Sequence, residues 1–534
     1  MQRLSPFSRY FLLGFLGLTL PLLAAPPAAP SNFSAIATGP NAIDFAWQDN
    51  SNDENGFRIY FRVGTSGEFL ILGNTGPNVT GASVSSLNSQ TTYQYKIFAF
   101  KNPGPEELSA EIGIITVVTP PPFPVLGNLV GPILSETGIS DLSLPAGSPS
   151  QSIPINGLFS DPDVAIAARL ITDLGNIDFA FLPNAAPLTV TNFLNYLNRG
   201  DFTNVMFHRS ISNFVIQAGG FRADATASAI AKDPPVINEP LISNRRGTVA
   251  MAKLGGFPNS ATNQFFINLA NNSTNLDSNN YGFTVFARVA GNGMTVADAI
   301  AALPRQNYAA INGALTHTPY RIGPALPYTP ANLVRILSAA SISPLSLNAG
   351  SSAPAIATAS ISGGNLVLVP VSPGISTITL TATDLDGLTA NTSFSFTVTP
   401  DTYEAWALRQ NFANGPDSLT TADPDRDGRS NLVEFALATA PLASSAADLL
   451  AGTAAGRLTF SFPLRLHTSG ISVGLESSET LDGLWTLRWE AQDGISHPWI
   501  LSAVTTGNFQ TITAQNPVPA SLSRQFLRLR VTKL

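Results

Sequence analysis

The chain has 534 residues, too many for one hydrophobic core, and we expect roughly three to five domains. Apolar residues make up 44% of it but charged residues only 12%, and 42 Gly and 41 Pro predict short elements joined by many turns, as in β-sandwiches rather than helical bundles. The net charge is −7 and no basic run occurs, which argues against a nucleic-acid partner.

The N-terminus has the pattern of a secretory signal. Arg3 and Arg9 precede the apolar run FLLGFLGLTLPLLAA, and small residues follow, so residues 1–25 are assigned to a signal peptide. The run is too short for a membrane span, and no later segment approaches the required length. We therefore expect an exported protein, periplasmic, at the cell surface or extracellular, with no transmembrane span in the mature chain. Export would permit disulfides, but the sequence has no cysteine.

Residues 30–120 alternate strand-like runs with turn clusters. AIDFAWQD contains a single tryptophan, Trp47, and the turn-rich NSNDENG follows it. Further on, Tyr93, Tyr95 and Ile97 alternate with polar residues, the period of a half-buried strand. These features resemble a fibronectin type III domain, and the resemblance implies a spacer or contact module whose aromatic residues fill a core.

Two separated stretches of sequence predict one shared sandwich. PPPFP predicts an extended linker, and residues 121–165 around it resemble the opening strands of an immunoglobulin-like sandwich. The strands that would complete it come only at 339–400, where ISTITLTATD and SFSFTVT alternate strictly. The simplest account is a split sandwich with residues 166–338 inserted into it, which is tolerated when the guest's termini lie close together.

The inserted segment carries recognisable motifs. LGNIDFAFLPNAAPLTVTNFLNYLNRGDFTNVMFHRSISNFVIQAGGF and RRGTVAMAKLGGFPNSATNQFFINLANNSTNLDSNNYGFTVFARV are similar, in content and order, to segments of the cyclophilin-type peptidyl-prolyl isomerases, especially the bacterial forms. The resemblance implies an eight-stranded closed β-barrel capped by two helices, the first of them formed by APLTVTNFLNYLNRG. The predicted fold class is therefore mainly β and multidomain, with this barrel inserted in the immunoglobulin-like sandwich.

Isomerisation of an X–Pro bond requires no nucleophile, metal or cofactor. Rotating an amide costs about 18–20 kcal/mol because the twisted state loses its resonance. A catalyst needs an apolar pocket for the proline ring, a donor aimed at the twisted amide, and little competing water. Phenylalanine rings can form the pocket, and a guanidinium, always charged and rich in donors, can serve the amide.

The resemblance implies a role for each matching residue. Arg209 would donate to the prolyl amide, Phe214 would wall the pocket, and Gln217 would orient Arg209 and bind the peptide backbone. His208 would be a packed scaffold residue. The other residues implied in substrate binding are Ala252 and Gln264 in the neighbouring groove, Phe266 and Leu276 around the proline, and Phe283 as a further wall.

Four positions depart from the family's pattern, namely Val215, Lys253, Asn275 and Phe283. They replace a methionine, an asparagine, a tryptophan and a histidine, and they bear on turnover and inhibitor binding rather than on fold. A lone arginine and glutamine on strands would ordinarily form an exposed ion-pairing face. The coincidence of two separate motifs favours an isomerase site, and an inactive peptide-binding domain is the main rival.

The segment DPDRDGRSNLVE, within a predicted helix-loop-helix at 401–445, has the spacing of an EF-hand-like calcium loop. Alternate carboxylates can converge on one cation, glycine permits the sharp turn, and the last glutamate can bind with two oxygens. The alternative is an acidic surface turn. We expect a structural Ca²⁺ that braces the junction before a C-terminal β domain at 446–534. The predicted ligands are Asp423, Asp425, Asp427, the backbone carbonyl of Arg429, Asn431 and Glu434.

These observations together predict an exported, multidomain prolyl isomerase that assists folding of proline-containing or unfolded exported proteins. No cofactor is expected for catalysis, and the other modules would make contacts with a cell surface or matrix. The alternative is a non-catalytic adhesion or peptide-binding protein with a degenerate cyclophilin domain. A carbohydrate-associated protein is a third reading, which rests on module style alone.

Overall fold

The computed structural model describes residues 25–101, 107–135, 137–321, 328–444, 449–493, 496–517 and 526–534. The predicted signal peptide lies outside these residues apart from its last one. The chain forms two compact units, one of residues 1–127 with 168–341 and the other of residues 128–167 with 342–534. None of the helices in the described ranges is long and apolar enough to cross a membrane.

The first part of the chain folds into two small antiparallel sheets. One sheet has the order β1(Ser31–Gly39), β2(Ala42–Gln48), β5(Gly81–Val84). The other has the order β4(Leu70–Asn74), β3(Gly56–Val63), β6(Thr92–Lys101), β7(Glu107–Leu108), and β8(Ile115–Val118) also pairs with β6. Trp47 and Phe57 pack with ring centroids 5.4 Å apart, and Tyr95 is fully buried among them. The alternating aromatic residues therefore fill a core, as predicted.

The inserted segment forms one large sheet. Its strand order is β15(Val205–Met206), β23(Arg335–Ile342), β13(Ala167–Thr172), β14(Gly175–Phe181), β20(Val285–Ala290), β18(Thr248–Met251), β19(Phe265–Asn268), β17(Val215–Ala218), β16(Arg209–Ile211). The strands at the two ends of this order, β15 and β16, are separated along the chain only by Phe207 and His208. The Phe207 amide donates to Val334 and the His208 amide to Gln217, so this segment changes partners within one residue and closes the barrel.

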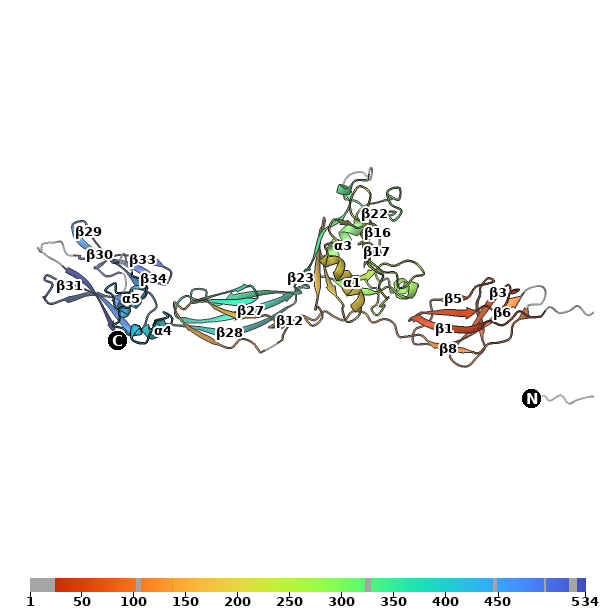
Figure 1. The fold of residues 1–534 in the computed structure, drawn as a ribbon, viewed down its shortest axis with the longest axis horizontal. Helices are drawn as coiled ribbons and strands as arrows, with labels where there is room; N and C mark the ends of the chain where they lie inside the picture. Colours follow the sequence, from red (N-terminus) through yellow and green to blue (C-terminus); the bar gives the residue numbers. More distant parts are fainter. Residues whose placement is uncertain are drawn as a thin grey trace, which may run out of the picture. The chain divides into compact units, whose positions relative to one another are not determined.

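The strand count is therefore nine rather than the predicted eight, because one strand is interrupted where it changes partners. Two helices lie against the sheet, α1(Pro187–Asn198) packing on β20 and α3(Gly293–Ala302) on β14 (Figure 1). The short remaining elements are α2(Ser273–Leu276), η1(Asn279–Tyr281), β21(Arg305–Gln306), β22(Thr318–Pro319) and η2(Pro330–Asn332).

A proline and a glycine mark the two ends of helix α1. Pro187 occupies the first turn, where a missing amide proton is harmless, and Gly200 follows the helix at φ 73°, in the left-handed region that glycine favours. The helix buries Phe193, whose ring lies 4.8 Å from that of Phe202 and 5.1 Å from that of Phe286. This aromatic cluster fills the barrel and fixes the strands that carry the site.

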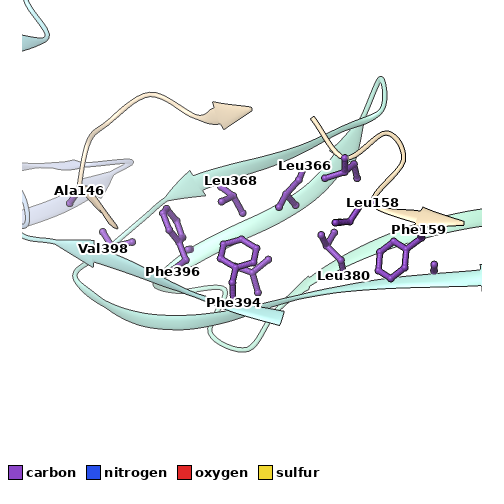
Figure 2. Close-up of a cluster of buried hydrophobic side chains, with 13 residues drawn as sticks. Ala146, Leu158, Phe159, Leu366, Leu368, Leu380, Phe394, Phe396 and Val398 are labelled. Carbon is purple, nitrogen blue, oxygen red and sulfur yellow. The ribbon is translucent and has the colours of Figure 1, made fainter. Parts of the chain in front are cut away.

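In the second unit, strands from before and after the insertion share sheets. β10(Leu142–Pro145) lies parallel to β28(Thr389–Thr399), and β11(Gln151–Pro154) lies antiparallel to β26(Asn365–Pro370). Figure 2 shows Leu158 and Phe159 beside Leu380 of a later strand, in one core with Phe394. The other strands are β9(Ile133–Leu134), β12(Phe159–Ser160), β24(Leu345–Ser351), β25(Ala357–Ser362) and β27(Gly374–Asp384).

The C-terminal part begins with two short helices and continues as two antiparallel sheets. The helical elements are α4(Tyr403–Leu408), η3(Pro416–Ser418), α5(Asn431–Leu437) and, later, η4(Ala491–Asp493). One sheet is β29(Leu450–Ala454), β30(Arg457–Arg465), β34(Phe509–Gln515), β33(Ile500–Thr506), and the other is β32(Thr486–Glu490), β31(Ile471–Ser478), β35(Phe526–Lys533). The predicted helices flanking the acidic loop are thus present, and the loop lies between them.

Candidate functional site

A β-hairpin places Arg209 beside Gln217. Strands β16 and β17 pair antiparallel with these two residues directly opposite each other, and Asn213 in the connecting turn takes a left-handed φ of 55°. Directly opposed side chains lie within about 4.5–5.5 Å at Cβ. The Arg209 Nη1 therefore reaches the Gln217 Oε1 at 3.3 Å and donates a hydrogen bond to it.

A second amide continues this arrangement on the neighbouring strand. Gln217 Nε2 donates to the Gln264 Oε1 at 2.8 Å, and Gln264 immediately precedes β19. The Gln264 carbonyl accepts from the Ala252 amide at 2.9 Å. Each end of the Gln217 amide thus has its own partner, which fixes the side chain that faces Arg209.

An apolar wall lies next to this polar row. Phe266 and Leu276 are 4% and 6% exposed and belong to one buried cluster, with Phe214, Ala252 and Phe283 packed against it. The Phe266 and Phe283 rings meet edge to face with centroids 5.8 Å apart. The Arg209 guanidinium carbon lies 5.9 Å from the centroid of the Phe214 ring. The structure therefore brings together all the groove residues predicted from the sequence.

The charge at the centre of the groove is a half-buried cation. Burial lowers the pKa of Arg209, and no carboxylate in the described ranges forms an ion pair with it. Its neighbour His208 is only 2% exposed, and burial, with the charge of Arg209 as the second cause, lowers the pKa of His208 to about 3. A neutral, buried imidazole packed 5.0 Å from the Phe221 ring is a scaffold group, as predicted, and not an acid or base.

A pocket of about 610 Å³ opens beside Gln217 and Gln264. Its lining includes the exposed Lys232 and the half-buried Lys253, and no acidic residue. Lys253 Nζ donates to the backbone carbonyls of Asn280 and Gly282, at 2.6 and 2.5 Å. Burial lowers the pKa of Lys253 to about 8. The pocket is thus a positively charged extension of the groove.

A buried asparagine network, which was not predicted from the sequence, lies behind the groove. Asn272 Nδ2 donates to the Phe214 carbonyl at 2.9 Å and to the Asn268 Oδ1 at 2.7 Å, and Asn268 Nδ2 donates to the Thr248 hydroxyl at 2.9 Å. These bonds tie the turn that carries Phe214 to strands β18 and β19. The run NNSTNLDSNN was a usable signal, because asparagine rarely occupies buried positions without such partners. By contrast, Asn275 in the same run is exposed and lies outside the apolar cluster.

The acidic loop in the second unit converges on one point. Asp423, Asp425 and Asp427 each place a carboxylate oxygen within 4.8 Å of the others. Backbone amides support the first of them, since the Asp423 oxygens accept from Asp427 at 3.2 Å and from Gly428 at 3.0 Å. Gly428 takes φ 89°, where a side chain would be strained. These backbone amides and the left-handed Gly428 therefore turn the loop so that its three carboxylates face one point.

Two further predicted ligands lie on helix α5 and are fully buried. Asn431 and Glu434 are both 0% exposed, and the Asn431 Oδ1 and both Glu434 carboxylate oxygens have no hydrogen-bond partner among the described residues. Burial, followed by the charges of Asp425, Asp427 and Asp423, raises the pKa of Glu434 to about 8. An ionised carboxylate buried without a partner costs several kcal/mol. The donor set, all oxygen and mostly anionic, fits the ligand preference of Ca²⁺.

Comparisons with known proteins concern the inserted barrel. A family model described as cyclophilin type peptidyl-prolyl cis-trans isomerase/CLD matches residues 167–318. Over 140 residues the chain is 42% identical to a peptidyl-prolyl cis-trans isomerase of Acinetobacter baylyi, which covers 26% of this chain and 72% of that protein. Over 135 residues it is 40% identical to peptidyl-prolyl cis-trans isomerase B of Escherichia coli, covering 24% of this chain and 80% of that protein. A crystal structure of a cyclophilin-type isomerase of Cryptosporidium parvum is 22% identical with a TM-score of 0.26, covering 33% of this chain and 98% of that one.

Proposed function

The chain belongs to the cyclophilin-type peptidyl-prolyl cis-trans isomerases, and from that premise we propose that its barrel isomerises X–Pro bonds in exported or extracellular proteins and so assists their folding. The observation that carries the proposal is the row Arg209–Gln217–Gln264 running alongside the apolar wall of Phe214 and Phe266. A proline ring packed on that wall would lie next to the guanidinium.

The chemistry asked of these residues is stabilisation of a twisted amide. As the C–N bond rotates, the prolyl nitrogen loses conjugation and becomes a hydrogen-bond acceptor, which it is not in the planar ground state. A donor already held at that place binds the twisted state better than the planar one, and this difference lowers the barrier. Arg209 supplies N–H groups, remains charged at every physiological pH, and is oriented by Gln217 before substrate arrives.

The apolar wall and the polar row bind different parts of the substrate. Phe214, Phe266 and Leu276 bind the ring by burying apolar surface, and their rigid packing excludes water that would compete for Arg209. Gln217 and Gln264 can pair with the peptide backbone on either side of the proline. No step transfers an electron or a group, so isomerisation by this arrangement needs no cofactor.

Export and the modular arrangement are part of the proposal. They are supported by the N-terminal signal pattern and the two-sheet architecture of the first part of the chain. In this proposal a fibronectin type III module and a split immunoglobulin-like module hold the barrel at a cell surface or matrix. Its clients would be proline-containing segments of unfolded exported chains.

A non-catalytic peptide-binding role is the second candidate. Leu254 and Phe257, which line the pocket beside the groove, are 67% and 64% exposed and offer apolar contact area to a bound chain. Binding alone would need the wall and the pocket but not the Arg209 donor. The two candidates therefore differ in what loss of that side chain does.

The test is the exchange rate of an X–Pro peptide, followed by NMR with the full chain. We expect faster cis–trans exchange in the presence of the protein, and Arg209→Ala should remove at least about 100-fold of that acceleration, the usual loss of a donor aimed at a transition state. Arg169→Ala is the matched control, because it removes a guanidinium that is 41% exposed and paired with Asp178 on another part of the sheet. Peptide shifts perturbed without any acceleration would leave the binding role in place of the enzyme.

We also propose that the loop at 423–434 binds one Ca²⁺. The supporting observation is the pair of buried side chains, Asn431 and Glu434, whose oxygens lack partners among the described residues at the spacing where ligands are expected. Titration calorimetry of the full chain with CaCl₂ should give a stoichiometry of about one. Asp425→Asn should weaken binding, and a wild-type chain that takes up no Ca²⁺ would disprove the site.

A further inference from the structure

The helix that carries the last calcium ligand is also part of the C-terminal core. On α5, Phe435, Ala436 and Leu437 follow Glu434 directly, and all are 0% exposed. Ala436 and Leu437 pack in one cluster with Trp489 and other side chains of both C-terminal sheets. Glu434 is therefore one residue away from the hydrophobic contacts that hold the helix in place.

The other side of α5 reaches the preceding helix. Phe435 packs with Tyr403 and Trp406 of α4, with ring centroids 5.9 and 5.5 Å away. The Arg465 Nε on β30 donates to the Phe435 carbonyl at 2.6 Å and so secures the end of α5 to the sheet. Helix α4, the acidic loop, α5 and β30 thus form one continuous packed assembly.

Neither buried ligand can leave the interior without disturbing this assembly. Asn431 Nδ2 donates to the backbone carbonyls of Asp417 and Leu419 at 2.6 and 2.9 Å, which fixes the amide and leaves its Oδ1 for another partner. The Glu434 carboxylate could reach water by rotation of α5, but that rotation would expose Phe435 and Leu437. Without such a rotation the carboxylate either stays protonated or shares a cation with the three aspartates of the loop.

We propose that Ca²⁺ is a folding ligand of the C-terminal region, so that occupancy of the loop sets the stability of residues 401–534 as a whole. This inference rests on the calcium site proposed above and is independent of the isomerase groove, which belongs to the other compact unit. A ligand that binds only the folded state raises its stability with the logarithm of ligand concentration. Glu434, with two oxygens available, favours Ca²⁺ over the smaller, six-coordinate Mg²⁺.

The distribution of tryptophan provides a selective readout. Of the five tryptophans, Trp406, Trp485, Trp489 and Trp499 lie in the C-terminal region, and Trp47 is the fifth. A full-length chain carrying Trp47→Phe would therefore report the melting of that region alone by fluorescence. The barrel contains no tryptophan, and its own integrity can be followed by isomerase activity in the same samples.

The experiment is thermal melting of this chain in chelator, in MgCl₂ and in CaCl₂, with metal affinity measured by calorimetry. At tenfold over the dissociation constant, Ca²⁺ should raise the melting temperature of the fluorescence transition by about 5 °C and leave the isomerase rate unchanged. Glu434→Gln should abolish the rise, whereas Glu479→Gln, which removes the same charge at an exposed site, should keep it. If Glu434→Gln fails to fold, Asp425→Asn in the loop takes its place.

The outcomes separate the two calcium proposals. Binding without a rise in melting temperature would overturn the folding role and leave the site, and absence of binding would overturn both. If Mg²⁺ raises the melting temperature equally, the effect is not specific to Ca²⁺. If the rise survives in both Glu434→Gln and Asp425→Asn, Ca²⁺ bound at this loop is not its cause. In each case the isomerase groove is judged by its own variant, Arg209→Ala.

Discussion

The groove of the barrel and the acidic loop before α5 use buried polar groups in opposite ways. In the groove, Gln217 accepts from Arg209 and donates to Gln264, so its side-chain polar groups already have partners within the protein. In the loop, the oxygens of Asn431 and Glu434 are buried and have no partner in the described part of the chain. The polar groups of the first site are paired as folded, whereas the second site leaves buried oxygens that the proposed Ca²⁺ would pair.

The difference follows from what we propose that each site binds. An X–Pro amide is neutral, so the groove must present pre-oriented donors whose alignment is already fixed before binding. A cation brings its own charge, so its site must gather negative oxygens that repel one another when it is absent. Strain is thus expected in the loop and not in the groove, and the predictions below probe that contrast.

The largest expected effect is that of removing the wall of the groove. Phe266→Ala deletes a ring that is 4% exposed and packed on Phe283, and the resulting cavity should destabilise the barrel by about 3–5 kcal/mol. Proline would lose its pocket, so isomerase activity should fall even under conditions where the barrel stays folded. Urea unfolding, followed by isomerase activity, measures the stability of the barrel. NMR exchange of the X–Pro peptide at low temperature measures the activity of the folded variant. The fluorescence transition of the C-terminal region should not move, and a shift there would contradict the separation of the two sites.

Gln217→Leu tests whether the groove depends on its internal hydrogen bonds. The change keeps the size of the side chain but removes the partner of Arg209, and we expect a loss of roughly 10-fold in kcat/KM, about 1.4 kcal/mol. The loss should fall mainly on kcat, because the guanidinium is then less well aimed while the wall still binds the ring. Gln264→Leu is the comparison, one hydrogen bond further away, and should cost less. An effect on KM alone would show that Gln217 only binds peptide.

The two regions should also respond to pH in opposite directions. His208 has its pKa lowered from 6.5 to about 3, so the unfolded barrel binds more protons between those values and barrel stability should fall as pH falls below 6.5. Glu434 has its pKa raised from 4.5 to about 8, so the calcium-free C-terminal region holds more protons folded than unfolded and should lose stability as pH rises from 4.5 to 8.

Each slope has a limit of about 1.4 kcal/mol per pH unit for one proton. Melting curves of both transitions between pH 5 and 7 in chelator would measure them. His208→Asn should flatten the first slope and Glu434→Gln the second, and saturating Ca²⁺ should remove the second in the unmodified chain. Parallel slopes in both regions would show that other groups dominate.

The sequence predicted the groove well because its residues lie in two contiguous motifs. Arg209 and Gln217 are close in sequence, and an antiparallel hairpin with a short turn brings such residues opposite each other. The helix α1 was predictable for a similar reason, since Pro187 and the spacing of Val190, Phe193 and Leu197 mark its start and its buried face. Local patterns of this kind need no knowledge of the rest of the fold.

What depended on distant partners was not predictable. The break between β15 and β16 arises because the segment pairs with β23 on one side and β17 on the other, and β23 lies more than 120 residues away. The spacing predicted Glu434 as a ligand but did not predict that it is 0% exposed, because that burial comes from packing of α5 on β30 and on α4. The asparagine run around Asn272 did signal buried polar partners, but that one of them is the distant Phe214 carbonyl could not be read from it.

The smallest expected effect concerns the charge of the pocket next to the groove. Among the described residues Lys232 and Lys253 line this pocket and no acidic residue does, whereas three aspartates converge in the loop, so the two sites should select opposite charges. A peptide with Glu two residues before the proline should have a KM roughly 2–5-fold lower than its Gln counterpart at low salt, because exposed charges attract by less than about 1 kcal/mol. Lys253→Asn should halve this preference at most, since its Nζ is already held by the Asn280 and Gly282 carbonyls, and Lys232→Ala should remove more of it.

Raising the salt to 0.5 M should erase the difference between the peptides in the wild type, because the charges are then screened. If the preference for the Glu peptide persists at that salt, the pocket recognises the shape of the glutamate side chain. The charge of the pocket then does not determine which peptides the barrel prefers.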